Sequence, residues 1–444
     1  MKKTLLTLAT LTLTLVGNAA YIDTIDQVLV EKDLVADFGM VADDAASDQS
    51  AKLQDAIDEI SAKGGGRIYL PAGTYSFNSI YMNSNVHLVI DKGVIIKPFL
   101  HESQKGNGVF HFTNKSESRK GEEGFIENVS IRCSEEGEYF TIDYSHIPLN
   151  IKHKRQEKHS ARAFKCVQVR NFMIEGMYVI DNWTTHCAGI FVPSKIEGCD
   201  EWEVYKPTAG LIRNFKSINS SPGYGLAQLH AGYDLRFENL STTNGGITFR
   251  LETGAGGHYG GVDQISADTI YCENGVTAMA MGPHTAKNGM VTARNITALS
   301  CGTAVQMGPG FDDGRENSGV PGRFADGCLI ENVHAVYGEN APIATKTISH
   351  LAEWQLERLW FDEKTQLIRG PSQWIAHDKT GDSWSPTIRD VTSEGFSPEI
   401  SPVLEREKQP RSDYKAILKN YSIWKELPEY LKVGSKKPKK ERKH

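Results

Sequence analysis

A short motif recurs along this chain: a polar residue, then Asn, then an apolar residue. From Asn214 onward, its copies are separated by 25, 30, 26 and 37 residues, a spacing typical of stacked coils with loops of variable length. The central residues of the copies are Asn128, Asn171, Asn214, Asn239, Thr269, Asn295, Asn332 and Asp390. A recurrent amide of this kind indicates a turn residue or an internal ladder of hydrogen-bonded side chains. The motif therefore predicts a solenoid.

Alternating apolar residues between the motifs predict strands. Residues 291–299 alternate with a period of two, as a half-buried strand does. A second set of strands is expected at 224–230, 246–252, 275–281 and 302–307. The resulting prediction is an all-β, right-handed parallel β-helix. A solenoid also allows roughly 420 mature residues to form one domain, because each coil contacts only its neighbours.

The residues before the first motif predict a cap at about 35–98. A helix is expected at about 48–63, ended by three consecutive glycines, with strands at 67–75, near Ile80 and at 86–90. The apolar face of this helix consists of Leu53, Ala56, Ile57 and Ile60. A solenoid needs such a cover because its open end exposes strand edges.

The two ends of the chain carry further signals. Residues 1–20 combine two lysines, an apolar run and small residues before Ala20, which is typical of a secretory signal peptide. The run is too short to span a membrane comfortably, so we expect a secreted or periplasmic protein without a membrane span. Residues 21–430 would form the β-helix domain. Residues 431–444 form a basic tail, which we expect to be disordered.

Charge and cysteine content narrow the function classes. The formal net charge is −6, and removal of Lys2 and Lys3 makes it −8, which argues against nucleic-acid binding. An anionic sugar polymer remains compatible, because a local basic groove can lie on an acidic protein. The seven cysteines are odd in number and form no zinc-type pair motif. Cys187 and Cys199 could close a loop, whereas Cys272, Cys301 and Cys328 are expected in the core. We expect a monomer.

The second set of strands gathers polar side chains on one surface. If Ile247, Phe249 and Leu251 point inward, Thr248, Arg250 and Glu252 point outward. The same alternation in the neighbouring coils places Gln228 with His230, Met279 with Met281, and Gln306 on the outward side. Stacked coils place equivalent residues about 4.8 Å apart. The polar residues expected to converge are Gln228, His230, Arg250, Glu252 and Gln306.

Glu252 is the leading candidate for chemistry. A carboxylate beside Arg250 in an apolar strand is consistent with an exposed ion pair, or with a general acid for glycosidic cleavage that needs a raised pKa. Arg250 opposes a raised pKa and is better suited to binding an anionic group of a substrate. His284 and His230 could position a hydroxyl or carry a proton, or serve as structural residues. Gln228 and Gln306 could hold a water or a sugar hydroxyl, or extend a polar ladder.

Two loops complete the candidate site. Residues 254–261 are rich in glycine but lack the helix and the Lys-Ser/Thr of a phosphate loop, so we interpret them as a flexible lip. Residues 310–317 could ligate Ca²⁺ through carboxylates and carbonyls, although their spacing matches no standard calcium loop. The metal content is left open, and no cofactor is assigned.

Motifs in two parts of the chain resemble known proteins. Residues 37–39, 69–75 and 86–94 resemble the N-terminal cap of the pectate-lyase-like β-helix superfamily. Within it, Gln228, Arg250-Leu-Glu252 and Gly282-Pro-His284 are similar to iota-carrageenases, glycoside hydrolase family 82. The resemblance implies an inverting hydrolase of sulfated algal galactans. It implies that Glu252 is the acid, that Gln228 holds the catalytic water and that His284 binds substrate.

One position departs from that family. The family pattern has an Asp two residues after the Glu, and this chain has Gly254. An inverting hydrolase needs a second carboxylate about 6.5–9.5 Å from the first. Asp263, Asp312 or Asp313 could supply it from a loop. Three hypotheses stay open: a glycoside hydrolase, a polysaccharide lyase acting on a uronate polymer, and a non-catalytic glycan-binding β-helix.

Overall fold

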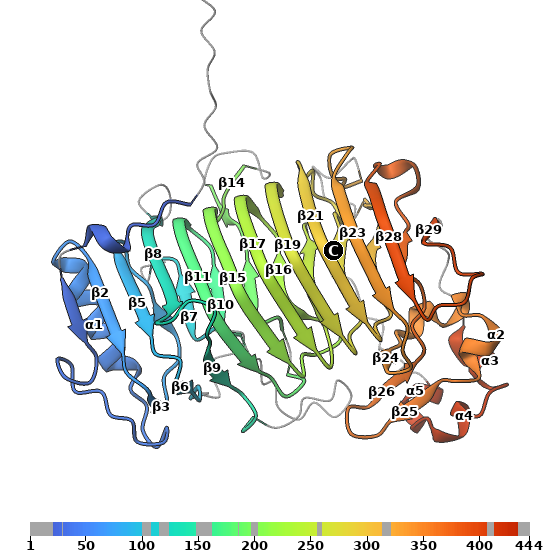
Figure 1. The fold of residues 1–444 in the computed structure, drawn as a ribbon, viewed down its shortest axis with the longest axis horizontal. Coiled ribbons are helices and arrows are strands. Elements are labelled where there is room, and N and C mark those ends of the chain that lie inside the picture. The colour runs from blue at the N-terminus through green and yellow to red at the C-terminus, as the bar shows by residue number, and fades with distance from the viewer. Residues whose placement is uncertain are drawn as a thin grey trace, which may run out of the picture.

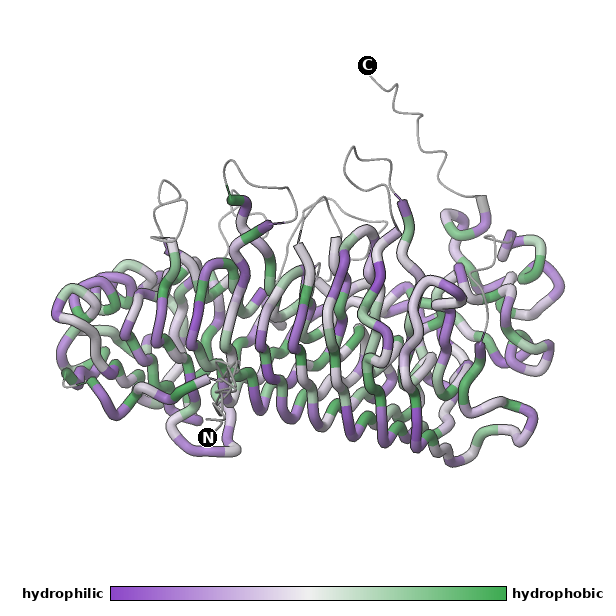
Figure 2. The backbone as a smooth tube through the Cα atoms, turned by 90° about the horizontal axis from the view of Figure 1, so that it is seen from above, coloured by the Kyte–Doolittle hydropathy of each residue, from purple (hydrophilic) through white to green (hydrophobic). Residues whose placement is uncertain are grey.

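The computed structural model describes residues 21–28, 30–99, 108–114, 124–147, 162–184, 186–196, 203–254, 260–312, 321–405 and 413–433. The segment predicted as a signal peptide lies outside these residues, as does the predicted tail beyond Val433. The described chain is a right-handed parallel β-helix, as predicted (Figure 1). Seen from above, successive coils lie side by side along the long axis (Figure 2). No helix among these residues has the length and apolar character needed to cross a bilayer.

The first sheet carries the recurrent motif. Its main path consists of β1 (Glu31–Asp33), β2 (Gly66–Leu70), β5 (Val86–Ile90), β8 (Ile126–Cys133), β11 (Val169–Ile180), β15 (Thr208–Ile218), β17 (Gly232–Thr243), β19 (Val262–Glu273), β21 (Val291–Leu299), β23 (Leu329–Val336) and β28 (Thr387–Glu394). Three shorter strands extend it: β3 (Gly73–Tyr75), β6 (Val94–Ile96) and β9 (Phe140–Asp143). The neighbours in this sheet run parallel, as a solenoid requires.

The second sheet contains the strands predicted to carry the site. In spatial order it consists of β4 (Ile80–Tyr81), β7 (Phe110–Phe112), β10 (Phe164–Cys166), β12 (Gly189–Phe191), β16 (Gly225–Leu229), β18 (Ile247–Glu252), β20 (Thr277–Gly282), β22 (Thr303–Met307), β27 (Ala376–Asp378) and β29 (Val403–Glu405). Its neighbours are also parallel, one coil apart. One side of this sheet faces the core, and the other side is the outer face.

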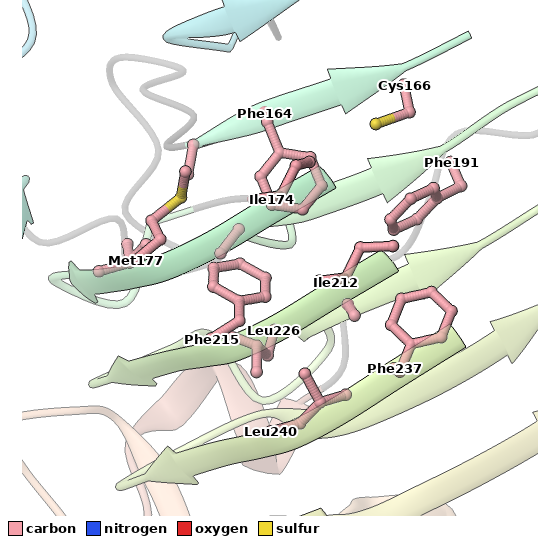
Figure 3. Packing of buried hydrophobic residues seen from close by; sticks show 14 of the residues in the cluster. Phe164, Cys166, Ile174, Met177, Phe191, Ile212, Phe215, Leu226, Phe237 and Leu240 are labelled. Atoms are coloured by element: carbon pink, nitrogen blue, oxygen red, sulfur yellow. The ribbon is translucent and has the colours of Figure 1, made fainter. Parts of the chain in front are cut away.

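The space between the two sheets is filled by apolar side chains stacked coil upon coil (Figure 3). Phe164 and Phe191 lie 5.7 Å apart between ring centroids, and Phe191 and Phe237 lie 5.4 Å apart. Such contacts repeat along the axis and bury large aromatic areas. Cys272, Cys301 and Cys328 lie in this core, as predicted. All six described cysteines are buried free thiols, and Cys199 lies outside the described residues.

The recurrent motif residues lie in the first sheet, and all eight have a left-handed backbone with φ between 49° and 60°. Asn tolerates this conformation better than most residues. The side-chain amides form a ladder, as predicted: Asn128 Nδ2 donates to Asn85 Oδ1 at 3.0 Å, and Asn239 Nδ2 donates to Asn214 Oδ1 at 2.7 Å. The ladder lies on the outside of the coil, because Asn239 is exposed, and the expectation of an internal ladder was wrong.

Both ends of the solenoid are covered. Helix α1 (Ser50–Ala62) buries the predicted face of Leu53, Ala56, Ile57 and Ile60 over the first coil. At the other end, a small unit with its own hydrophobic cluster was not predicted. It contains β24 (Ala341–Pro342), η4 (Thr345–His350), α2 (Glu353–Leu356), β25 (Trp360–Asp362), β26 (Leu367–Gly370), α3 (Tyr414–Leu418), α4 (Ile423–Glu426) and α5 (Glu429–Val433). Helix α5 therefore extends three residues into the predicted tail.

The first described residues lie against the outside of the first sheet. They precede η1 (Ile25–Gln27). The guanidinium of Arg132 donates to both carboxylate oxygens of Asp23, at 2.9 and 3.0 Å, and to the Tyr21 hydroxyl at 3.1 Å. The Ile22 N–H donates to Asn171 Oδ1 at 2.8 Å. The segment Tyr21–Asp23 thus connects the N-terminal end of the described chain to the asparagine ladder.

Candidate active site

The strand register brings the predicted polar residues onto the outer face of the second sheet. Gln228 pairs with Arg250, Arg250 with Ala280, and Ala280 with Gln306. Gln228, Arg250 and Gln306 therefore share one row, as predicted. Gln306 lies two strands from Arg250 and is not among the described side chains that contact Glu252.

Two predicted orientations are wrong. Met279 pairs with Phe249 and Met281 with Leu251, and both methionines lie in the core rather than on the outer face. Thr248 also points inward, because its hydroxyl contacts Thr242 Oγ1 at 2.6 Å and donates to the Tyr271 carbonyl at 2.9 Å. At the corner of the coil, consecutive side chains point inward. The prediction assumed instead that side chains alternate between the two faces of the strand.

Glu252 is the centre of a hydrogen-bond network drawn from three adjacent coils. Its Oε2 accepts from Gln228 Nε2 at 2.7 Å, and its Oε1 accepts from the Arg250 guanidinium. His284 Nε2 lies 3.4 Å from Oε1. Arg250 also donates from Nη1 to the Gly223 carbonyl at 2.6 Å. The sequence did not identify the Gly223 carbonyl, because backbone acceptors carry no residue-type signal.

The amide of Gln228 has a defined orientation. The atom that faces Glu252 Oε2 must be the amide nitrogen, because a carboxylate oxygen can only accept. The same nitrogen lies 2.8 Å from His230 Nε2. Since an amide nitrogen cannot accept, His230 must accept at Nε2 and carry its proton on Nδ1. Gln228 is only 5% exposed, and its Oε1 has no hydrogen-bond partner among the described residues. This oxygen is an acceptor available to a ligand hydroxyl or a water.

The charge state of Glu252 follows from its neighbours. Burial raises the pKa of this carboxyl, but the hydrogen bond from His284 and the charge of Arg250 outweigh it, so the net pKa is lowered. Glu252 is therefore ionised in the unliganded protein at neutral pH. A role as a general acid requires that a ligand change this balance.

His284 lies in the turn after β20. It has a left-handed backbone, with φ at 43°. Its carbonyl accepts from the Phe311 N–H at 2.7 Å, and the Phe311 ring lies 5.0 Å from its imidazole. Phe311 was not singled out from the sequence. It supports His284 from the loop that follows β22.

Gly254 has a packing role in the same region. Its φ is +74°, and a Cβ atom at this position would lie 2.7 Å from Thr285 Oγ1 and 3.0 Å from the Ala286 nitrogen. The turn after Glu252 thus approaches the backbone that carries His284 more closely than a side chain allows. At the position where the resemblance implied a carboxylate, this chain has a glycine that permits close contact between two site turns.

The three proposed second carboxylates have different surroundings. Asp263 Oδ1 accepts from the backbone N–H groups of Gln264 and Met290, both at 2.8 Å, at the start of β19 in the first sheet. Asp312 is exposed and follows Phe311 directly, beside His284. Asp313 lies outside the described residues. Among the three, Asp312 is the one that the described structure brings to the rim of the site.

No metal centre is evident in the described part of the chain. Among these residues, no group of three or more His, Cys, Asp or Glu side chains is arranged to hold a metal ion. Most of the loop considered for Ca²⁺, from residue 313 to 317, lies outside them, as does the glycine-rich lip at 255–259.

Comparisons with known proteins agree with this fold. A family model described as "Rhamnogalacturonase A/epimerase, pectate lyase-like" matches residues 34–203. The iota-carrageenases of Alteromonas macleodii and Zobellia galactanivorans are each 34% identical, over 64% and 70% of this chain. A solved iota-carrageenase complexed to iota-carrageenan fragments is 26% identical, with a TM-score of 0.74 over 89% of this chain and 95% of that chain.

The fold and these matches define the class of the protein. The chain has the right-handed parallel β-helix fold of the pectate-lyase-like superfamily, and residues 34–203 match a family model of it. Within that superfamily it is similar to the iota-carrageenases, glycoside hydrolase family 82. The matched regions cover 53% and 60% of the lengths of the two curated relatives.

Proposed function

We propose that this protein is a secreted glycoside hydrolase that cleaves an anionic, sulfated galactan of the iota-carrageenan type. The observation that carries the proposal is the convergence of Gln228, Arg250 and His284 on the half-buried carboxylate of Glu252. The similarity to iota-carrageenases supports the substrate class. The signal-peptide pattern of residues 1–20 supports export.

In the proposed mechanism, Glu252 is the general acid and Arg250 controls its protonation. In the free protein, Arg250 stabilises the ionised form of Glu252. A sulfate ester of the substrate would attract the guanidinium and weaken this stabilisation, since Arg binds such oxyanions through its planar fork. Burial, the largest influence on this carboxyl, would then raise the pKa of Glu252 and favour the protonated acid.

The second half of the reaction needs an activated water on the opposite face of the sugar. Gln228 Oε1 is the acceptor that we assign to this water, because it is buried and has no hydrogen-bond partner among the described residues. Asp312 is the carboxylate that we assign as the base, from its place beside Phe311 and His284. Asp263 is a weaker candidate because two backbone N–H groups already donate to its Oδ1.

Substitution Glu252→Gln tests this proposal. The variant should cleave iota-carrageenan about 100- to 10,000-fold more slowly, the range expected for loss of a general acid. Reducing ends are the measure, and ultraviolet absorbance of an unsaturated product end would instead indicate a lyase. Glu238→Gln is a matched control on the first sheet, where Glu238 pairs with Arg236. Full activity of the Glu252→Gln variant, or no cleavage of any carrageenan by the wild type, would contradict the proposal.

A further inference from the structure

Arg162 is a buried cation outside the network of Glu252. Its side chain is only 6% exposed. Its Nη1 lies 3.5 Å from the thiol of Cys187, and its buried Nε has no hydrogen-bond partner. Among the described residues, no carboxylate forms an ion pair with it. A buried guanidinium without an anion carries a desolvation cost that nothing described in the protein offsets, so the arrangement indicates a binding site for an external anion.

Contacts place Arg162 beside the outer face that carries Glu252, because its neighbour Cys187 packs with Ile190 of the outer row. Arg162 precedes β10, and β10, β12, β16 and β18 are consecutive neighbours in the second sheet. Arg162 is thus three strands from Arg250, or roughly 14 Å at the usual strand spacing. Its neighbour Cys187 packs with Ile190 and Val192 in a cluster separate from the solenoid core. Ile190 is the register partner of Gln228. The cluster therefore connects the surroundings of Arg162 with the hydrogen-bond network of Glu252.

The surroundings of Arg162 are positively charged. Lys165 pairs with His111 in the outer row, beside Arg162 in sequence. Burial and the charges of Lys165 and Arg162 together lower the pKa of His111 to about 4. Burial raises the pKa of the Cys187 thiol, and the charges of both Arg162 and Arg250 oppose this, so Cys187 lies within reach of both guanidinium groups.

We propose that Arg162, assisted by Lys165, binds a sulfate ester of the polymer at a position three coils from the cleavage site. This inference deepens the proposed function and rests on it for the identity of the polymer. A planar guanidinium donates two parallel hydrogen bonds to an oxyanion, and a buried position strengthens them. Only a chain long enough to reach from Glu252 to Arg162 gains this contact. The site therefore favours long substrates over short oligosaccharides.

The test compares binding by chain length in the inactive Glu252→Gln background. Iota-carrageenan oligosaccharides of increasing length are titrated calorimetrically into this protein and into versions that also carry Arg162→Met, Arg162→Lys or Arg170→Met. Arg170 is the matched control, because it is an arginine of the first sheet paired with Glu127 at 2.5 Å. We expect Arg162→Met to weaken binding of the longer oligosaccharides about 10- to 100-fold and to leave the shortest unchanged. Arg162→Lys should fall between, because Lys keeps the charge and loses the fork.

A purely structural role for Arg162 predicts a different result. Removal of a structural arginine lowers the midpoint of denaturant unfolding, whereas removal of an uncompensated buried cation leaves it unchanged or raises it. Equal affinity of the Arg162→Met protein and its parent for every oligosaccharide would overturn the anion site. If the Glu252→Gln parent protein binds no carrageenan, dextran sulfate and uncharged dextran are used as probes instead of carrageenan. Arg162-dependent binding of dextran sulfate alone would then reject the proposed function and retain the site.

Discussion

His230 is the residue whose role the structure changed most. The sequence suggested that it binds substrate, yet its Nε2 accepts a hydrogen bond from the Gln228 amide. Gln228 uses both of its amide hydrogens, one toward His230 and one toward Glu252. His230 is therefore a positioning residue in our interpretation: it fixes the amide so that Oε1 faces the position assigned to the water.

This role predicts different outcomes for two substitutions of His230. Gln at this position offers an acceptor oxygen at a reach similar to that of Nε2, so His230→Gln should keep kcat within a few-fold of wild type. His230→Phe keeps the ring volume but has no acceptor, and kcat should fall about 10- to 100-fold, the cost of one lost hydrogen bond to a functional group. Steady-state cleavage of iota-carrageenan measures both.

A readout independent of activity accompanies this prediction. The ¹⁵N chemical shifts of His230 should report a neutral ring protonated at Nδ1. Equal loss of kcat in the Gln and Phe variants, or a proton on Nε2 in the wild type, would show that His230 does not orient Gln228.

Residue types and spacing predicted much of the site. Gln228, Arg250, Glu252 and His284 were all expected on one face, because strand periodicity and a short motif suffice to place them. Arg162 and Phe311 were missed, since neither lies in a repeat nor in a recognisable motif. Their importance depends on which loops and coil corners approach the outer face, and this is set by contacts distant in sequence.

At the level of elements, the asparagine ladder serves two purposes at each coil. Asn239 in β17 has a φ of 53° and donates to Asn214 Oδ1 at 2.7 Å. The left-handed backbone favours Gly or Asn, and the hydrogen bond requires an amide. Other residue types satisfy only one of these demands or neither.

Substitutions at Asn239 should separate the two contributions. Asn239→Gly keeps the backbone conformation and loses the hydrogen bond, at a cost of about 1 kcal/mol. Asn239→Ala loses both, at about 2 kcal/mol. The order is informative because Gly in a strand is ordinarily the worse of the two. Urea unfolding measures the difference, with exposed Ser266→Ala in β19 as the control. An alanine variant more stable than the glycine variant would argue against backbone strain.

The elements themselves were largely predictable, because the motif and the period of two repeat in every coil. The error at Met279 and Met281 shows the limit. The prediction counted residue positions from the glycine that starts each segment, and this aligned Arg250 with Met279. In the structure, Arg250 pairs with Ala280. A shift of one residue exchanges the two faces of a strand. Only the backbone pairing, which the sequence pattern does not specify at the coil corners, resolves it.

At the scale of the whole molecule, a partly exposed ion pair between Asp23 and Arg132 holds the N-terminal end of the described chain. Burial raises the pKa of Asp23, but hydrogen bonds from Arg132 and from the Ile25 N–H outweigh it and lower the pKa to about 2. The stabilisation from this group is fully present above its ordinary pKa of 3.8 and is lost as the pH falls through 2. The stabilisation from Asp23 should thus be constant near neutral pH and decline only in acid.

Asp23→Asn should lower the free energy of unfolding by about 1 kcal/mol near neutral pH, a figure reduced for the partial exposure of this pair. The difference from wild type should shrink below pH 4 and vanish only below pH 2, because the folded wild-type carboxyl has a pKa of about 2 and is half protonated at that pH. Urea unfolding across this range measures it. Asp26→Asn is the control, since that side chain is 91% exposed. An undiminished difference at pH 2 would mean that Asp23 acts through something other than its charge.

The stacking of coils has an evolutionary consequence. Each coil adds one strand spacing, about 4.8 Å, to the outer face. The side chains of the second sheet therefore recur at a fixed interval along a bound polymer. Gain or loss of a single coil between β10 and β18 would change the distance between Arg162 and Glu252 by one strand spacing without altering either residue. Related proteins could therefore tune which pattern of charged groups they read by changing the number of coils, while the reacting groups stay as they are.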